Sequence, residues 1–259
     1  MPAKLSVNLN KIALLRNSRD TRIPDIVAAA ETCIEAGAQG ITVHPRPDLR
    51  HIRPEDVYRL AEFLAQPRYH HIEFNIEGNP DAGPEANGYP GFMTLVKSVR
   101  PHQCTLVPDD PGQLTSDHGF DLQKDLAVDD NLLSGHIAAL KTLGIRVSLF
   151  MDPDTEQIKR APDSGTDRIE LYTGPYADTF GTPEGDAVFT QFLDAAEVAA
   201  DLGLGLNAGH DLNLDNLPRF CQTRNLLEVS IGHALIKDAL WMGLASAVSA
   251  YRAILDQHS

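Results

Sequence analysis

Residues 35–44 read Glu35-Ala-Gly-Ala-Gln-Gly-Ile-Thr-Val-His44, in which a helix ends at a glycine and a short β-branched strand follows. Glycine supplies the left-handed backbone conformation that commonly ends a helix. The same order recurs around Gly144, Gly165 and Gly203. The repetition predicts a series of helix-to-strand turns in which β-strands and α-helices alternate along the chain.

Working outward from this stretch, we expect eight strands, over residues 5–8, 40–44, 72–77, 103–107, 146–150, 168–172, 205–208 and 228–231. Helices are expected between them, including residues 25–36, 54–64, 131–143, 186–202 and 234–243. Eight such units in 259 residues match the size of one (β/α)8 barrel. We therefore expect an α/β protein whose residues 1–259 form a single TIM-barrel domain with extra helical and loop insertions. A doubly wound open sheet is the alternative, but no G-x-G-x-x-G motif follows the first strand.

The composition excludes several classes of protein. There are 22 Lys and Arg against 36 Asp and Glu, a formal net charge of −14, which argues against an overall basic nucleic-acid binder. No apolar run approaches the roughly 20 residues that cross a bilayer, and the first residues lack a secretion signal. We expect a cytoplasmic protein without membrane contact. Its three cysteines, Cys33, Cys104 and Cys221, are far apart and are interpreted as reduced core thiols.

The expected strands alternate apolar with polar residues, and the polar side must line the lumen of the barrel because the helices cover the apolar side. This places Asn8, Glu73, Arg146, Arg168 and Glu170 inside. Buried charges cost several kcal/mol each unless they are paired. The pattern therefore favours an active site, with a layer of paired charges near the bottom of the barrel as the alternative.

The carboxyl ends of the strands, where barrel enzymes carry their catalytic groups, are rich in histidine. Three strand ends finish in His44, His210 and His233. Histidine exchanges protons near neutral pH, so this arrangement indicates acid/base chemistry.

The ends of the last two strands also indicate an anion site. Gly209 and Gly232 place small residues where backbone N–H groups can face a ligand, and Gly232 leads directly into a helix. Arg19 and Arg46, which follow the first two strands, could hold further anionic oxygens. An acidic protein can thus bind a phosphorylated metabolite in a local positive pocket.

The segment 108–121 is longer than a typical βα loop of about two to six residues. We interpret it as a mobile lid over the barrel mouth, with a solvated acidic loop as the alternative.

The chain resembles the pyridoxine 5′-phosphate synthase family of the deoxyxylulose-dependent vitamin B6 pathway. The resemblance covers nearly the whole chain in order, in segments 6–10, 13–19, 40–52, 105–108, 147–150, 169–177, 206–210 and 229–236. It includes Gly40-Ile-Thr-Val-His-Pro-Arg-Pro-Asp-Leu-Arg-His-Ile52 and Val229-Ser-Ile-Gly-His-Ala-Leu-Ile236.

This resemblance implies a transferase that condenses 1-deoxy-D-xylulose 5-phosphate with 3-amino-2-oxopropyl phosphate to give pyridoxine 5′-phosphate, phosphate and water. It implies no metal and no organic cofactor, and a homo-octamer of barrels. By analogy His44 and Glu73 accept protons, His210 donates one, and Glu170 stabilises charged intermediates. The aminoketone phosphate would be bound by Asn8, Arg19, Gly232 and His233, and the ketose phosphate by Arg46, His51 and Thr115.

Two places depart from the family pattern. The first strand is followed by Asn10-Lys11 where the family has Asp-His, and His210 is followed by Asp211 where the family has Gly. We include Asn10, Lys11 and Asp211 among the expected substrate contacts. Glu73 and Glu77 lie on one face of the third strand, and Glu73, which aligns without a gap, is the preferred base.

Two other functions remain open from the sequence. A different phosphosugar aldolase or isomerase would share the phosphate site and the acid/base set. A barrel that binds a phosphorylated metabolite without catalysis would show departures such as Asp211. A metal hydrolase is disfavoured, since the strand ends offer no H-x-H pair.

Overall fold

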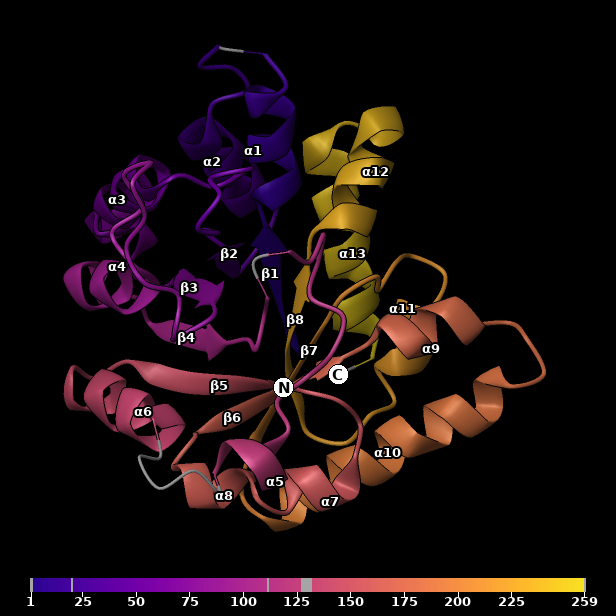
Figure 1. Ribbon diagram of the computed structural model, residues 1–259. Coiled ribbons are helices and arrows are strands. Elements are labelled where there is room, and N and C mark those ends of the chain that lie inside the picture. Colours follow the sequence, from indigo (N-terminus) through magenta and orange to yellow (C-terminus); the bar gives the residue numbers. More distant parts are fainter. Residues whose placement is uncertain (1, 20, 111, 127–131, 259) are drawn as a thin grey trace.

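The computed structural model describes residues 2–19, 21–110, 112–126 and 132–258. Within these residues eight parallel strands follow one another around a closed barrel, and β1 pairs with β8 to close it (Figure 1). The expected (β/α)8 barrel is confirmed. The strands are β1 (Lys4–Asn8), β2 (Gly40–Val43), β3 (Glu73–Gly78), β4 (Gln103–Leu106), β5 (Arg146–Met151), β6 (Arg168–Tyr172), β7 (Gly205–Gly209) and β8 (Leu226–Ile231).

Helices form the outer ring of the barrel (Figure 1). They are α1 (Asn10–Asn17), α2 (Ile26–Glu35), α3 (Pro54–Leu64), α4 (Phe92–Val99), α5 (Leu122–Asp125), α6 (Leu132–Thr142), α7 (Thr155–Ile158), α8 (Ala161–Ser164), α9 (Gly174–Thr179), α10 (Gly185–Asp201), α11 (Leu217–Phe220), α12 (His233–Met242) and α13 (Leu244–Gln257), with a 3₁₀ turn at Pro67–Tyr69. The expected helix 54–64 is confirmed residue for residue as α3. The expected start of helix 131–143 lies at residue 131, outside the described residues.

The apolar core lies between the strands and the helices. Leu5 and Val7 on β1 and Ile41 and Val43 on β2 are fully buried on the side that faces the helices. Alternation along each strand sends the intervening polar residues into the lumen. The core contains Cys33 and Cys104, while Cys221 is half-buried, and all three cysteines are unpaired as expected.

The lower half of the lumen is a layer of paired charges. Arg146 donates to Glu73 and, at 3.0 Å, to Gln103. Arg168 donates to Asn207 at 3.0 Å and lies 3.7 Å from the Glu228 carboxylate. For this layer the alternative interpretation of the polar lumen is therefore correct, because its charges are paired, although Glu228 Oε2 accepts no hydrogen bond from the described residues.

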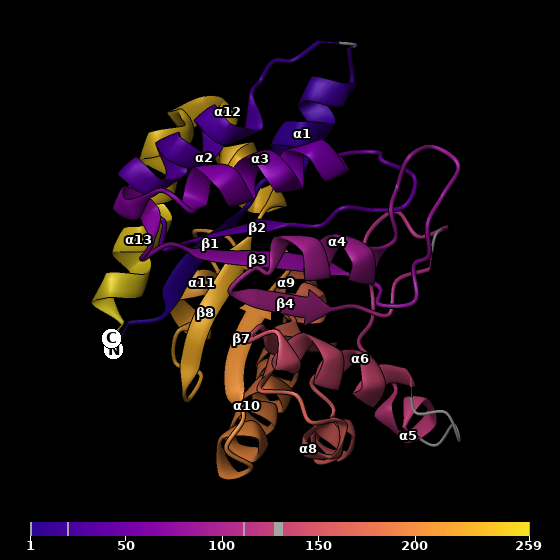
Figure 2. The ribbon, with the colours of Figure 1, turned by 90° about the vertical axis from the view of Figure 1, so that its left-hand side faces the viewer.

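The two ends of the barrel differ. Both chain termini lie at one end, and the long loops after β3 and β4 lie at the other, where the strands have their carboxyl ends (Figure 2). That end is the mouth of the barrel. Among the described helices, none combines the length and apolar character required to span a membrane.

Candidate active site

A cavity of about 350 Å³ opens at the mouth of the barrel. It brings together side chains from the ends of strands that are far apart in the sequence. The predicted site residues that line it are Asn8, Asn10, Lys11, His44, Arg46, His51, Thr115, Glu170, His210, Asp211, Gly232 and His233.

Glu73, the preferred base in the sequence analysis, is not among them. It is the first residue of β3 and pairs with Arg146 at the far end of the lumen, where Lys4 Nζ also lies 3.7 Å from its carboxylate. Glu77 lies four residues further along the same strand face and lines the cavity. The structure therefore places Glu77, and not Glu73, in the cavity wall, and which of the two glutamates acts as the base stays a prediction.

Glu77 is buried among polar side chains of the upper lumen. Its carboxylate accepts hydrogen bonds from Asn8 Nδ2 at 3.3 Å, Asn75 Nδ2 at 3.3 Å and Ser230 Oγ at 3.4 Å. Burial, together with the negative charge of nearby Glu170, raises its pKa well above the usual carboxyl range. A raised pKa makes the ionised form of this carboxyl group a stronger proton acceptor than an exposed glutamate.

Glu170 projects from β6 into the same cavity. Its Oε2 accepts a hydrogen bond from Thr105 Oγ1 at 3.4 Å, and burial raises its pKa to about 7. Gly209 makes room for it, because a Cβ atom at that position would lie 2.6 Å from Glu170 Oε1. A side chain larger than hydrogen at position 209 would displace the carboxylate.

His44 follows β2 and is almost completely buried. Its backbone N–H donates to Asn10 Oδ1 at 2.9 Å. The Asn10 side chain therefore helps to hold His44 in place. The ring nitrogen Nε2 lies 3.2 Å from Asp109 Oδ2, and Nδ1 lies 3.8 Å from Glu77 Oε2. Burial lowers the pKa of His44, so the ring favours its neutral form and can accept a proton.

His210 and Asp211 form a strained pair at the end of β7. Their φ angles are 87° and 59°, in the left-handed region that non-glycine residues rarely adopt. His210 Nδ1 lies 2.7 Å from Asp211 Oδ2, and Nε2 lies 3.0 Å from Thr115 Oγ1. Backbone strain of this kind is common where a fold holds a functional side chain in place.

One side of the cavity is suited to a phosphate. Gly232 precedes α12, whose first N–H groups have no partner within the helix and face the mouth of the barrel. The backbone here passes close to β1, since a Cβ on Gly232 would lie 3.1 Å from Asn8 Cβ. His233 and Lys11 also line the cavity and add donors to it.

A second basic group in the cavity wall comes from the segment between β2 and α3. Arg46 donates to Asp109 at 2.5 Å, and Arg50 donates to the carbonyls of Gln113 and Leu114 at 2.9 and 3.1 Å. Burial lowers the pKa of His51 to about 2, and its Nδ1 accepts the backbone N–H of Ile52 at 2.9 Å. His51 is therefore neutral and can offer Nε2–H to an oxygen.

Arg19 is the other predicted residue that the structure does not bring to the cavity. It follows α1, is exposed, and is not part of the cavity wall. In contrast, Arg50, Phe150 and Ser230 line the cavity and were not singled out from the sequence. Arg50 lies within segment 40–52, which carries the family resemblance, and that resemblance could have identified it as a site residue.

The described part of segment 108–121 covers the mouth. Leu114, Thr115 and Ser116 form part of the cavity wall, and Ser116 Oγ donates to Asp109 Oδ2 at 3.1 Å. The segment is thus positioned as a cover, while its mobility stays a prediction.

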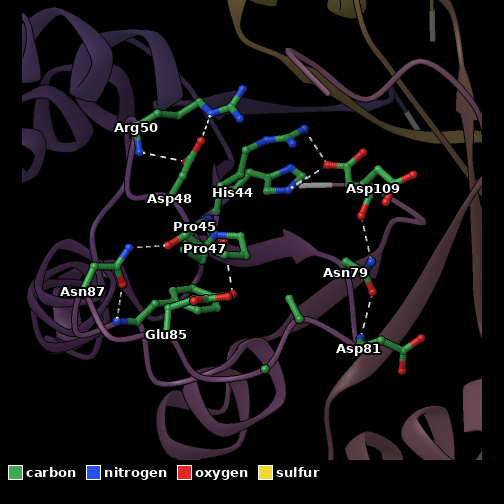
Figure 3. A pocket seen from close by; sticks show the side chains of 15 residues that line it. His44, Pro45, Pro47, Asp48, Arg50, Asn79, Asp81, Glu85, Asn87 and Asp109 are labelled. Atoms are coloured by element: carbon green, nitrogen blue, oxygen red, sulfur yellow. Dashed lines mark hydrogen bonds and ion pairs between the residues drawn. The ribbon is translucent and has the colours of Figure 1, made fainter. Parts of the chain in front are cut away.

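A second cavity of about 560 Å³ adjoins the first and is lined by the segments after β2, β3 and β4 (Figure 3). His44, Arg46 and Arg50 belong to the walls of both cavities. Asp109 borders the second cavity and points toward His44 and Arg46 (Figure 3). The His44–Asp109 contact therefore lies between the two spaces.

Among the described residues, no group of three or more His, Cys, Asp and Glu side chains is arranged to hold a metal ion. The expected absence of a cofactor remains a prediction.

The fold is similar to those of solved barrels with little sequence identity. The 3-keto-L-gulonate-6-phosphate decarboxylase of Vibrio cholerae O1 biovar El Tor superposes with a TM-score of 0.65 at 12% identity, over all of both chains. The phosphoribosyl anthranilate isomerase of Thermotoga maritima gives 0.59 at 13% identity and covers 98% of this chain and 99% of that one. At these identities the likeness concerns the fold alone.

Similarity in sequence is far greater to another group of proteins. The pyridoxine 5′-phosphate synthase of Xanthomonas campestris pv. campestris strain B100 is 55% identical over 256 residues, covering 98% of this chain and 97% of that protein. The pyridoxine 5′-phosphate synthase of Xylella fastidiosa strain M23 is 53% identical over 254 residues, covering 98% and 95%. The family model described as pyridoxal phosphate biosynthesis protein PdxJ matches residues 5–257. The chain belongs to the PdxJ family.

Proposed function

We propose that this chain is a pyridoxine 5′-phosphate synthase, condensing 1-deoxy-D-xylulose 5-phosphate with 3-amino-2-oxopropyl phosphate. The products are pyridoxine 5′-phosphate, inorganic phosphate and water. The observation that carries the proposal is a single cavity whose wall combines acid/base groups from four strand ends with two groups of residues suited to anions. Family membership and the name shared by its close relatives support the same reaction.

The two groups suited to anions fit two phosphorylated substrates. The N-terminus of α12, with Gly232 and His233, would hold the phosphate of the aminoketone. Arg46, Arg50 and His51 on the segment between β2 and α3 would bind the ketose phosphate, with Thr115 closing over it. One phosphate must stay bound while the other leaves, and separate groups allow this.

The acid/base groups of the cavity fit the steps of the reaction. The amine of one substrate attacks the ketone of the other, so the Schiff base forms between the ligands and the protein need not supply a lysine. Protons must then be removed and returned during phosphate loss, dehydration and ring closure. His44 and Glu77 would accept protons, His210 would donate one, and Glu170 would stabilise charged intermediates.

Glu77 takes the role that the sequence analysis gave to Glu73. Glu77 lies 3.8 Å from His44 and borders the cavity, whereas Glu73 is engaged with Arg146 in the lower lumen. Only a residue that borders the substrate space can exchange protons with a substrate.

The test is to supply both substrates to purified, metal-free protein and to follow pyridoxine 5′-phosphate and inorganic phosphate together. We expect equal amounts of the two products and none when either substrate is omitted. Turnover of the ketose phosphate alone would instead indicate an aldolase or isomerase. Binding by calorimetry without any product would indicate a barrel that only binds phosphorylated metabolites.

We also propose that the chain self-associates as the homo-octamer expected from the resemblance. α1 and α12 pack against each other, and Leu15, Leu240 and Trp241 on them are 57%, 69% and 86% exposed. Neighbouring apolar side chains left in water are typical of an interface. Sedimentation of the wild type and of Trp241→Glu checks this, and an unchanged mass for the variant would place the interface elsewhere. The cytoplasmic location stays a prediction.

A further inference from the structure

Asp109 lies at the base of the segment that covers the cavity and contacts three other side chains. Its Oδ2 atom lies 2.5 Å from Arg46 Nη2, 3.1 Å from Ser116 Oγ and 3.2 Å from His44 Nε2. The side chain is only 7% exposed, and its backbone carbonyl accepts Asn79 Nδ2 at 2.8 Å (Figure 3). Hydrogen bonds to both the backbone carbonyl and the carboxylate of Asp109 therefore fix its position.

The direction of each hydrogen bond to Asp109 follows from its charge. Its contacts with His44 and Arg46 hold its pKa below the usual carboxyl range in spite of burial. An ionised carboxylate only accepts hydrogen bonds, so the group facing it must donate. His44 must then carry its proton on Nε2, which leaves the lone pair on Nδ1.

The second ring nitrogen faces the reaction space. His44 Nδ1 points toward Glu77, at 3.8 Å, and both residues border the cavity of the proposed active site. In the opposite tautomer the proton would occupy Nδ1, and Nε2 would present its lone pair to the Asp109 carboxylate. That arrangement would set two acceptors 3.2 Å apart in a buried place, which is strongly unfavourable.

We propose that Asp109 is a positioning residue that fixes His44 in the tautomer with the proton on Nε2, so that Nδ1 is the proton acceptor. The catalytic part of this proposal rests on the proposed function. The tautomer itself does not, and it can be measured without any turnover.

The other charged groups around His44 allow the effect on pH dependence to be worked out. Arg46 and Arg50 lower the pKa of the His44 ring, and Asp109 raises it. Glu77 on β3 and His51 on the loop after β2 also face the ring. Removing the charge of Asp109 therefore lowers the pKa of His44 further. The acid limb of the pH profile of kcat/KM, where His44 becomes protonated and stops accepting protons, should move to lower pH.

The direct test is nitrogen NMR of protein labelled with ¹⁵N-histidine, with the His44 signals identified by their loss in His44→Gln. We expect wild-type Nε2 to be protonated and Nδ1 to be unprotonated at neutral pH, and Asp109→Asn to show a mixture of tautomers. A proton on Nδ1 in the wild type would overturn the proposal whether or not any variant folds. The same result in Asp109→Asn as in the wild type would also overturn it.

Kinetics provides the second test. Asp109→Asn should lower kcat by about 10² to 10⁴-fold, by analogy with an aspartate that orients a histidine base, and should shift the acid limb downward. If Asp109 served only to hold Arg46, KM for the ketose phosphate would rise while kcat and the acid limb stayed unchanged, and the proposal would be wrong. Asp110→Asn, which removes a charge from the next residue, is the matched control and should match the wild type.

The two proposals fail separately. Wild-type protein that makes no pyridoxine 5′-phosphate would overturn the proposed function, while the NMR result would still decide the tautomer.

Discussion

Glu73 and Glu77 lie on the same lumen face of β3 but at opposite ends of the barrel interior. Glu73 is paired with Arg146, and Glu77 lies 3.8 Å from His44 Nδ1. The strand spans Glu73–Gly78, so four residues along it separate a structural charge layer from the reaction space.

This separation predicts opposite effects of the same substitution. Glu77→Gln should lower turnover by about 10² to 10⁴-fold without loss of stability, because it removes a proton acceptor and leaves a neutral side chain of similar size in its place. Glu73→Gln should leave turnover intact but lower the free energy of unfolding by about 1 to 2 kcal/mol, since Arg146 loses its ionic partner. Steady-state kinetics and urea unfolding of both variants measure this. An inactive Glu73→Gln beside an active Glu77→Gln would restore the preference drawn from the alignment.

The raised pKa of Glu170 predicts a pH-dependent stability. Its pKa is about 7 in the folded protein, against about 4.3 for an exposed glutamate. Below about pH 4.3 Glu170 is protonated in both the folded and the unfolded protein, and its contribution to the free energy of unfolding is fully present. This contribution is lost as the pH rises through about 7, because the buried carboxyl group must then ionise in the folded protein. Glu170→Gln stays neutral and escapes this loss. Relative to the wild type, Glu170→Gln should therefore gain up to about 3 kcal/mol in free energy of unfolding as the pH rises from 5 to 8.

Thermal unfolding at pH 5, 6, 7 and 8 measures that difference. A constant difference across the series would show that the ionisation of Glu170 is not coupled to folding. Turnover of Glu170→Gln should be impaired most above pH 7, where the wild-type side chain carries the charge that stabilises intermediates.

Asp211 predicts a conflict between stability and activity. Its φ of 59° lies in the left-handed region, which Asp tolerates better than most residues and which only glycine adopts freely, so Asp211→Gly should relieve backbone strain of at most about 1 kcal/mol. The same change removes the carboxylate 2.7 Å from His210 Nδ1 and should lower kcat by about 10-fold or more.

Asn225→Gly is the matched control for Asp211→Gly. Asn225 has the same φ of 59° and is exposed in the turn before β8, outside the cavity wall. It should gain stability without any change in kcat. If both variants kept wild-type kcat, Asp211 would have no role toward His210.

Most of the fold could be predicted because β2, β5, β6 and β7 each follow a helix that ends at a glycine, and because apolar and polar residues alternate along the strands. β6 and α3 match the predicted boundaries exactly as residues 168–172 and 54–64. The short helices α5, α7, α8 and α11 were not predicted, since four residues give no helical period. α1 was also missed, because its polar first residues were assigned to the site rather than to a helix.

The sequence could predict which residues belong to the site, but not how far along the barrel axis each of them lies. Strand ends identify which residues meet at the mouth, as the convergence of His44, Glu170 and His210 confirms. Alternation along β3 shows that Glu73 and Glu77 share a face, but it does not show which of them lies nearer the mouth of the barrel. That position depends on the tilt and register of the strand. Asp109 was read only as part of a loop, because its contacts with His44 and Arg46 join segments more than 60 residues apart.

A buried ion pair between α1 and α3 supports the segment that carries His51. Arg16 and Asp56 are 6% and 2% exposed and meet through two hydrogen bonds of 2.5 and 2.8 Å, and Arg16 also donates to the carbonyl of His51 at 3.2 Å. Asp56 further accepts the backbone N–H of Arg53 at 2.9 Å, which caps α3. The pair therefore fixes both a helix start and a residue of the cavity wall.

Asp56→Ala should lower the free energy of unfolding by about 3 to 5 kcal/mol, because it leaves the buried Arg16 charge without a partner. Arg59→Ala, which breaks a 2.7 Å pair with Asp25 on the surface, should lower it by less than about 1 kcal/mol. Urea unfolding compares the two variants. In the double variant Arg16→Met, Asp56→Leu, part of the loss should be recovered, since neither charge then remains buried. A double variant that is less stable than Asp56→Leu by the full effect of Arg16→Met alone would show that the two side chains act independently.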